Sequence, residues 1–511
     1  MTRDEQPSPQ AESPPPRWAL LALLVIAAAA LWPYRHFAGD DASITFRFVR
    51  SLVDGMGYSF NPGHPTYGST APLWVFLIAI VTKLGLGVAD SAHLLNALFA
   101  ALSVISFWQL AAMFIRRPLV LCLAGLLYVL NPWFVRWSMS GMENGLSLWL
   151  WTLAVLHQLR SRDAEGFNWV SPACAALATL TRPEMTVFSL LLFADTLLFR
   201  RERKLRELLL GGVLYGLLLV PWVIYAYVHF GSLIPNTISA KLSRDHVQVF
   251  VRTLYFMGSF WPFHALCLVV AALLGKKQLG PWLRSRAEQA RWFLIVGWGL
   301  ALPAFYVVGG APISGRYLMF ALPSYVLVGA AVFDYLLEVR SELPPAAARA
   351  IRALVVASTL GTLALLGYVQ YRYCWYVTRW PEGMDPPMIE VARYLRDHSA
   401  PGASVAADQI GVLGYFSERT VIDIGALASP EMLPYRKMKD KNAIWRHIRE
   451  RAPEFLFVID DVPLLVSRDP GYASVELMRE VDVQREGASS AGGLQRFRLY
   501  RTHWTPTKPA H

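Results

Sequence analysis

Long apolar runs alternate with short polar stretches from residue 18 to residue 372, and this pattern predicts a bundle of membrane-spanning helices. A typical hydrocarbon core is about 30 Å thick, so the shorter runs require local thinning of the bilayer. We expect about eleven crossings, at residues 18–33, 93–115, 118–133, 144–159, 168–181, 185–199, 208–228, 250–273, 291–309, 316–336 and 351–372.

Basic residues between the apolar runs predict the orientation of the chain in the membrane. They cluster at residues 116–117, 160–162, 200–206 and 276–286, and we expect these loops to face the cytoplasm. The N-terminus then lies inside and the C-terminus outside. A further apolar run at residues 72–87 would reverse every later loop if it crossed, so we interpret it as an interfacial helix that begins at Pro72.

The same assignment of loops to the inner and outer sides of the membrane divides the chain into three parts. Residues 1–17 are expected to form a disordered cytoplasmic tail, because they are rich in proline, serine and acidic residues. Residues 18–373 form the transmembrane domain, with a first external loop at residues 34–91. Residues 374–511 form an extracytoplasmic α/β domain.

Composition agrees with this fold class, a polytopic α-helical membrane protein. The chain of 511 residues is 54% hydrophobic and only 17% charged, which is more apolar than soluble domains are. The net charge of +11 is accounted for by the basic loops, and no nucleic-acid motif is present. We therefore expect a lipid bilayer and no nucleic acid as its partner.

The C-terminal part predicts alternating helices and strands. Helical patterns occur at residues 387–398 and 442–451, and strand patterns at residues 404–407, 420–423 and 455–459. Four polar or glycine residues at strand ends are better explained by turn chemistry than by binding; they are Asp408, Gly411, Gly414 and Asp423.

Two adjacent carboxylates, Asp40 and Asp41, follow the first apolar run directly. Acidic residues at a membrane edge are costly and persist mainly where they bind ions, substrates or protons. The alternative is that Asp41 caps an amphipathic helix that Gly55 ends, which would leave Asp40 unexplained. The residues alone leave catalysis, metal binding and capping open.

Other polar residues are expected on the same outer side of the membrane. Taken singly, each has an ordinary explanation as a helix cap, a snorkelling side chain or a solvated loop charge. Together they could form one site with a carboxylate pole and a phosphate-binding pole. The residues are Glu143, Arg182, Asn236, Lys241, Arg316 and Tyr317.

The order of these short segments resembles the GT-C-fold glycosyltransferases that use polyprenyl-phosphate sugars, and most of all the bacterial group of terminal arabinofuranosyltransferases. The segments are Asp40-Asp41, Gly57 to Gly63, Thr70 to Trp74, Ser140 to Glu143, Thr181 to Glu184, Ile234 to Thr237 with Ala240-Lys241, and Gly315 to Tyr317; in the C-terminal part they are Asp408 to Gly411, Gly414-Tyr415 and Val421 to Gly425. The chain departs from the group's pattern at Tyr67 to Pro72 and at Met142 to Asn144. These departures leave the fold expectation intact and the sugar open.

The resemblance implies transfer of a sugar, with arabinofuranose as one candidate, from a polyprenyl-monophosphate donor to an envelope glycan or glycolipid acceptor. The reaction would take place at the outer face of a bacterial cytoplasmic membrane. The alternative is a transporter or flippase of a lipid-linked glycan, which makes no glycosidic bond.

In the transferase, Asp40 or Asp41 is the expected base, and three cations are expected to stabilise the departing phosphate. These cations are Arg182, Lys241 and Arg316, with Arg244 as a fourth candidate. Glu143 and the second aspartate would bind sugar hydroxyls or a divalent cation, Mg²⁺, Mn²⁺ or Ca²⁺, with Asp41 and Glu143 as the candidate ligands. No sequence feature requires the metal.

Overall fold

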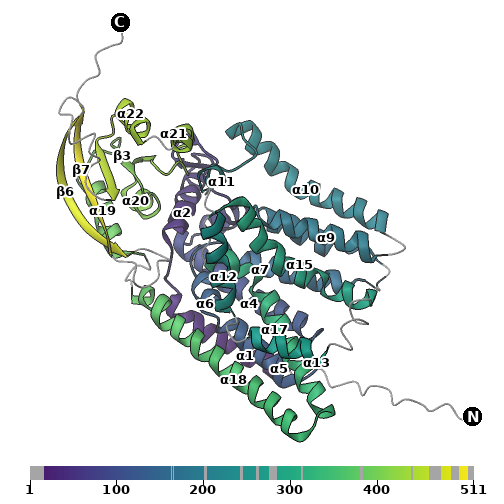
Figure 1. Cartoon of the computed structure of the whole chain (residues 1–511). Helices are drawn as coiled ribbons and strands as arrows, with labels where there is room; N and C mark the ends of the chain where they lie inside the picture. The colour runs from purple at the N-terminus through teal and green to yellow at the C-terminus, as the bar shows by residue number, and fades with distance from the viewer. Residues whose placement is uncertain are drawn as a thin grey trace, which may run out of the picture.

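The computed structural model describes residues 17–504 of the chain (Figure 1), and the statements below refer to these residues, except for those left out at 163, 165, 201–203, 242–245, 261–263, 276–284, 312–314, 380–383, 439–440, 460–472 and 485–493. Helices make up the part before residue 380, and all but two short strands lie after residue 403.

A bundle of apolar helices forms the larger part of the molecule (Figure 1). Within the described residues, six helical stretches are long and apolar enough to cross a membrane, and the bent pair α5–α6 makes a seventh if it counts as one span. The chain is therefore a polytopic helical membrane protein. The bundle as a whole, long and short helices together, contains α1 (Arg17–Leu31), α4 (Val88–Ala111), α5 (Pro118–Val129), α6 (Pro132–Ser138), α7 (Asn144–Arg160), α8 (Val170–Thr179), α9 (Met185–Phe199), α10 (Lys204–Phe230), α12 (His246–Phe260), α13 (His264–Leu274), α15 (Arg286–Gly309), α16 (Gly315–Leu318), α17 (Leu322–Val339) and α18 (Pro345–Val369).

Several of the expected crossings are shorter helices than a bilayer requires on average, among them α8 with 10 residues and α9 with 15 residues. The single helix expected over 250–273 is wrong, because the structure has two helices, α12 and α13, in its place. Helix α12 ends at Phe260, two residues before Pro262, where the missing N–H and the proline ring disfavour helix.

Close helix packing places the start of α7 in the interior of the bundle. Helices α4 and α7 lie together, and a Cβ added at Gly145 would come within 3.3 Å of the Ala100 backbone nitrogen. The hydroxyls of Ser106 and Thr152, 2.7 Å apart, join the same two helices. This packing holds Glu143, the residue that precedes α7, in a buried position.

Residues 34–91, which were expected to form the first external loop and keep that name below, contain the expected helices. Helix α2 (Asp40–Val53) is followed by Gly55 with φ +79°, so the predicted end is confirmed. A short hairpin, β1 (Ser59–Asn61) and β2 (His64–Pro65), leads to α3 (Pro72–Lys83), which begins at Pro72 as predicted.

The alternative explanation of Asp41 as a helix cap is wrong, because Gly39 is the N-cap residue of α2. Asp40 and Asp41 lie in the first turn, where carboxylates interact favourably with the helix dipole but do not close the helix end.

The C-terminal residues 386–504, here called the sheet segment, form a five-stranded sheet of order β4-β3-β5-β7-β6 with helices beside it. Strand β3 runs parallel to β4 and β5, and β7 runs antiparallel to β5 and β6. The elements are α19 (Pro386–Asp397), β3 (Ser404–Ala407), α20 (Gly411–Ser417), β4 (Thr420–Asp423), α21 (Leu433–Met438), α22 (Lys441–Arg451), β5 (Phe455–Ile459), β6 (Ala473–Gln484) and β7 (Leu494–Trp504).

All five elements expected from the pattern in this segment are confirmed. Helix α20 and the hairpin β6–β7 were not predicted. The prediction that Gly411 and Gly414 are turn residues is wrong, because both lie in α20. A Cβ at Gly414 would lie 2.7 Å from the Phe60 ring, so close packing explains this glycine within a helix.

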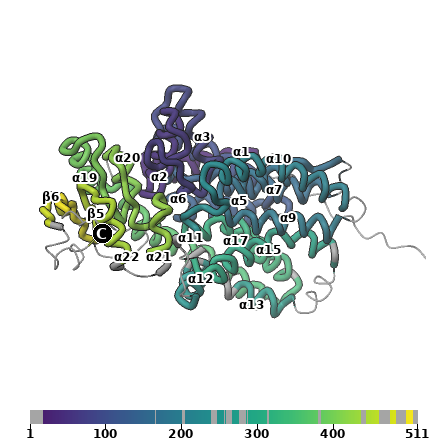
Figure 2. The backbone as a smooth tube through the Cα atoms, turned by 90° about the horizontal axis from the view of Figure 1, so that it is seen from above, coloured from purple at the N-terminus to yellow at the C-terminus, as the bar shows by residue number. Residues whose placement is uncertain are grey.

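The sheet segment lies against α2 on the side away from α10, and Figures 1 and 2 agree on this placement. Helix α20 packs on α2, and α21 contacts α11 (Asn236–Lys241). The first external loop therefore lies between the helical bundle and the sheet segment.

Candidate active site

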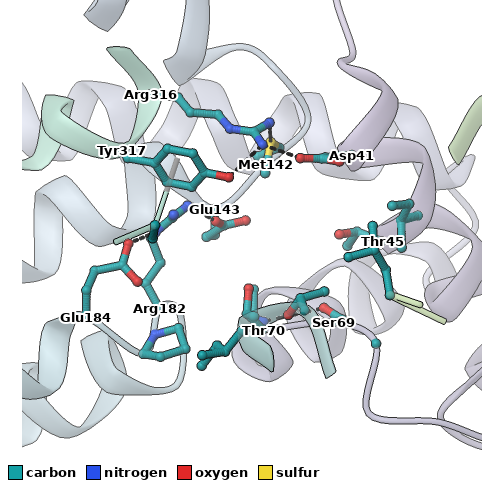
Figure 3. A pocket seen from close by; sticks show the side chains of 18 of the residues that line it. Asp41, Thr45, Ser69, Thr70, Met142, Glu143, Arg182, Glu184, Arg316 and Tyr317 are labelled. Carbon is teal, nitrogen blue, oxygen red and sulfur yellow. Dashed lines mark hydrogen bonds and ion pairs between the residues drawn. The ribbon is translucent and has the colours of Figure 1, made fainter. Parts of the chain in front are cut away.

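A cavity of about 180 Å³ lies where residues 41–71 meet the ends of several bundle helices (Figure 3). Helix α2 and the connection from β2 to α3 line one side of the cavity. The starts of α7, α9 and α16, together with the end of α15, line the other side. The lining includes Asp41, Ile44, Thr45, residues 68–71, Met142, Glu143, residues 182–184, Thr237, Ile238, Phe305, Tyr306, Gly309, Ala311, Arg316, Tyr317 and Leu427.

An ion pair between Asp41 and Arg316 crosses this cavity. Figure 3 shows the two side chains pointing toward each other, and the Arg316 Nη2 donates to Asp41 Oδ2. The same nitrogen donates to the Tyr317 hydroxyl at 2.9 Å, and the guanidinium carbon lies 4.8 Å from the centre of that ring. The side chains keep 27% (Asp41) and 14% (Arg316) of their surface exposed, so an incoming ligand can reach both.

A second charged group lies deeper in the same cavity. Arg182 donates from Nη1 to Glu143 Oε1 at 2.6 Å and from Nε to Glu184 Oε1 at 2.5 Å. The Tyr306 hydroxyl donates to that same Glu184 oxygen at 2.6 Å. The side chains of Arg182, Glu143 and Glu184 are buried, at 7%, 3% and 7% exposure.

The two carboxylates determine the charge of this group. Burial lowers the pKa of Arg182, but Glu184 and Glu143 reverse this effect and hold the pKa well above its ordinary value. The guanidinium therefore stays charged, yet two carboxylates outweigh it. The pair of Arg316 with Asp41 is more exposed to the cavity than the buried pairs of Arg182, so Arg316 is the better placed of the two arginines to neutralise a phosphate.

Asp40 faces a different part of the molecule from Asp41. Its Oδ1 accepts a hydrogen bond of 2.8 Å from the Val412 backbone N–H, in the first turn of α20. A Cβ at Gly411 would lie 2.0 Å from the Asp40 carbonyl oxygen, so only glycine allows this approach. Consecutive residues of a helix point about 100° apart, which is why adjacent carboxylates reach separate neighbours.

Among the expected residues whose side chains the structure describes, five lie together in the cavity, and Asp40 and Asn236 do not line it. The five are Asp41, Glu143, Arg182, Arg316 and Tyr317. Asn236 is buried, and its backbone N–H donates to the Tyr67 carbonyl at 2.9 Å, while the next two residues line the cavity. Lys241 ends α11, but its side chain and the whole of Arg244 lie outside the described residues.

Glu184 and Tyr306 were missed as site residues. Glu184 stands in the polar segment Thr181 to Glu184, and its spacing of two from Arg182 was a signal that the two side chains could pair. Tyr306 lies in an apolar helix, where its sequence context gives no indication of a polar contact.

No group of three or more histidine, cysteine, aspartate or glutamate residues is arranged to hold a metal ion in the described part of the chain. The two candidate metal ligands, Asp41 and Glu143, are each paired with an arginine. The divalent cation remains a prediction.

Asp423 behaves as turn chemistry predicts. Its buried carboxylate accepts hydrogen bonds from the backbone N–H groups of Gly425, Leu427 and Ala428, at 2.7, 2.5 and 2.7 Å. This pattern orders the loop that follows β4.

Comparison with known protein families gives two matches along the chain. Residues 64–225 match the family described as dolichyl-phosphate-mannose-protein mannosyltransferase. Residues 370–506 match a domain of unknown function, DUF8728.

Two curated proteins are similar in sequence, and both are named terminal β-(1→2)-arabinofuranosyltransferase. The protein of Corynebacterium glutamicum is 31% identical over 257 residues, which cover 44% of this chain and 36% of that protein. The protein of Mycobacterium tuberculosis is 30% identical over 241 residues, covering 43% of this chain and 38% of that protein. The chain thus matches little more than a third of the length of these relatives.

Among solved structures, the crystal structure of ArnT from Cupriavidus metallidurans bound to undecaprenyl phosphate has the same fold. The TM-score is 0.57 at 14% sequence identity, over 94% of this chain and 97% of that chain. The predicted resemblance to GT-C-fold membrane glycosyltransferases is confirmed by these matches. The named relatives are glycosyltransferases, so the transporter alternative is not favoured.

Proposed function

We propose that this chain transfers a sugar from a polyprenyl monophosphate to an envelope glycan or glycolipid at the outer face of a bacterial cytoplasmic membrane. Arabinofuranose is the leading candidate sugar, because both curated relatives are arabinofuranosyltransferases. The observation that carries the proposal is the exchangeable Asp41–Arg316 pair in a cavity at the ends of the bundle helices.

The two partners of this pair suit the two charges that develop during transfer. The acceptor oxygen forms a bond to the anomeric carbon, the bond from that carbon to the phosphate oxygen breaks, and its electron pair leaves with the polyprenyl phosphate. Asp41 accepts the proton of the acceptor hydroxyl. Arg316 donates hydrogen bonds to the phosphate as its negative charge grows.

Donor binding would also prepare the base. A phosphate with two free oxygens competes with Asp41 for the forked guanidinium of Arg316. Once Arg316 turns to the phosphate, the Asp41 carboxylate loses this ion pair and becomes a stronger proton acceptor. In the absence of donor, the ion pair therefore keeps the Asp41 carboxylate and the Arg316 guanidinium bonded to each other.

The remaining residues would bind the substrates around this pair. Glu143 is held at the cavity wall by Arg182, and it would accept hydrogen bonds from sugar hydroxyls or ligate a divalent cation if one binds. Tyr317 would contact the sugar. Lys241 and Asn236, at the two ends of α11, would support the phosphate from the side of that helix.

We further propose the membrane arrangement expected from the basic loops, with about eleven crossings, the one at residues 250–273 made by α12 and α13 together. The N-terminus then lies in the cytoplasm, and residues 374–511 form an extracytoplasmic domain. Cysteine labelling with an impermeant thiol reagent tests it. His64→Cys should react from outside intact cells, and Lys204→Cys should not, although both residues are exposed. The reverse result would overturn the arrangement.

Transfer is tested with the purified full-length chain in lipid nanodiscs, farnesyl-phosphate arabinofuranose as donor and octyl arabinofuranosides as acceptors. We expect a new glycosidic bond, detected by mass spectrometry. Arg316→Gln should lower kcat strongly, and Arg316→Lys should restore only part of it, because an ammonium lacks the planar fork. Movement of a labelled polyprenyl-phosphate sugar across the bilayer without bond formation would support the transporter instead.

A further inference from the structure

The sheet segment contributes a residue to the cavity lining. This segment lies within residues 370–506, which match a domain of unknown function. Leu427, in the loop that follows β4, is one of the lining residues. Its carbonyl oxygen lies so near the first external loop that a Cβ at Gly68 would come within 2.9 Å of it. Gly68 itself lines the cavity, so residues 424–428, here called the wall loop, close part of its rim.

The wall loop has a fixed shape. The fully buried Asp423 carboxylate accepts backbone hydrogen bonds from three of the next five residues. The Asp423 N–H in turn donates to the Ser429 hydroxyl at 2.9 Å. Ala426 lies at φ +62°, a left-handed conformation that is uncommon for a non-glycine residue, and the hydrogen bonds to Asp423 on both sides of it stabilise this turn.

The sheet segment is also fixed on the first external loop. The buried Arg47 of α2 donates to the carbonyls of Phe60, Gly414 and Arg419, at 3.0, 2.5 and 3.0 Å. The Asn61 amide pairs with both backbone groups of Val421, at 2.8 and 3.0 Å, as a neighbouring strand would. The wall loop therefore keeps its place relative to Asp41, which lies on the same helix as Arg47.

The position of the wall loop indicates which substrate it faces. The isoprenoid tail of a donor stays in hydrocarbon, so the donor must enter from the bundle helices, where Arg316 lies. The acceptor glycan is hydrophilic and reaches the cavity from water. In Figure 3, Thr45, Ser69 and Thr70 of the first external loop lie across the cavity from Tyr317 and Glu184, and the wall loop packs on this first-loop side.

We infer that the sheet segment forms the acceptor-side wall of the cavity, and that Leu427 is a specificity-determining residue that sets how large an acceptor sugar fits. This inference rests on the proposed transfer reaction. It assigns Leu427 a role in acceptor selection only, since its side chain is uncharged and cannot neutralise a phosphate.

Two substitutions of opposite size test the inference in the full-length protein. Leu427→Ala removes bulk from the wall, and Leu427→Trp adds it. With octyl arabinofuranosides of one, two and three sugars, Leu427→Trp should raise the KM for the larger acceptors about tenfold or more, and Leu427→Ala should lower the preference for the smallest one. Affinity for undecaprenyl phosphate, followed by tryptophan fluorescence, should change less than about twofold in both variants.

A matched control is Leu477→Ala, because Leu477 is 51% exposed on β6, at the far edge of the sheet from β4. It should leave acceptor preference unchanged. Unaltered preference in both Leu427 variants, or an equal loss of undecaprenyl phosphate affinity, would overturn the inference. A parent protein that binds undecaprenyl phosphate but extends none of the acceptors would instead overturn the proposed transfer reaction on which the inference rests.

Discussion

The two sides of helix α2 hold charged residues in different ways. On one side lies the cavity with Asp41. On the other lies the docking interface, defined as Asp40, Arg47 and Arg50 of α2 together with Asn61 of β1, against residues 411–421. In the docking interface these side chains bond chiefly to backbone groups, whereas in the cavity arginines and carboxylates bond to each other.

This difference separates structural roles from chemical ones. A backbone carbonyl or N–H is part of the fold and leaves its partner only if the chain moves. A side-chain ion pair beside a cavity can be exchanged, because a phosphate carries the charge and the oxygens to replace the carboxylate as the partner of the arginine. By this criterion Asp41 and Arg316 are available for chemistry, and Asp40 and Arg47 hold the two parts of the molecule together.

The largest effect on stability is expected inside the cavity, at Arg182. Arg182→Met leaves Glu143 and Glu184 buried beside each other without their cation, and loss of one partner of a buried ion pair costs about 3–5 kcal/mol. Denaturant unfolding of the purified protein measures the loss. Arg116→Met is the matched control, since its pair with Glu338 is 73% and 51% exposed, and it should cost about 1 kcal/mol or less. Equal losses of unfolding free energy in the two variants would show that the buried ion pairs of Arg182 contribute no more to stability than an exposed surface pair.

A smaller effect is expected in the docking interface, at Arg47. Arg47→Met deprives three carbonyls of a donor. The Gly414 carbonyl keeps its hydrogen bond from the Glu418 N–H, and we expect a total loss of about 1–3 kcal/mol, the cost of leaving a buried polar group unsatisfied. The same unfolding experiment should detect this loss, and limited proteolysis should cut the sheet segment sooner. Arg50→Met serves as control, because the Arg50 side chain is 32% exposed and water can replace its contacts. If Arg50→Met destabilised the protein more than Arg47→Met, the backbone contacts of Arg47 would not be the main attachment.

The smallest effect on stability is expected at Asp40. Asp40→Ala removes the acceptor of the Val412 N–H at the start of α20, and loss of such a contact costs about 0.5–2 kcal/mol. The thermal unfolding temperature of Asp40→Ala should be modestly lower than that of the parent protein. No change would argue that the contact with α20 contributes nothing, and complete loss of folded protein would give Asp40 a larger role than the structure indicates.

Much of the fold could be predicted because its signals are local. The amphipathic pattern after Asp41 and the position of Gly55 predicted the extent of α2, Pro72 predicted the start of α3, and short alternating runs predicted β3, β4 and β5. The hairpin β6–β7 was missed, because its strands carry many charged residues and its partners are distant in sequence.

The candidate site was only partly predictable for the same reason. Residue type and expected sidedness brought Glu143, Arg182 and Arg316 together correctly. The contact that turns Asp40 away from Asp41 is made with α20, 372 residues later in the chain, a helix that the sequence did not reveal. The contact of Tyr306 with Glu184 likewise depends on tertiary packing of an apolar helix and has no local signature.

The most direct test of the account is the turnover of two isosteric variants one residue apart, Asp41→Asn and Asp40→Asn, measured with farnesyl-phosphate arabinofuranose and an octyl arabinofuranoside. Asp41→Asn should lower kcat by about a hundredfold or more while the protein stays folded, because an amide cannot accept the proton. Asp40→Asn keeps an oxygen that can accept the Val412 N–H, so its kcat should stay within about tenfold of the parent. Equal losses in the two variants, or a greater loss in Asp40→Asn, would contradict the assignment of Asp41 as the base.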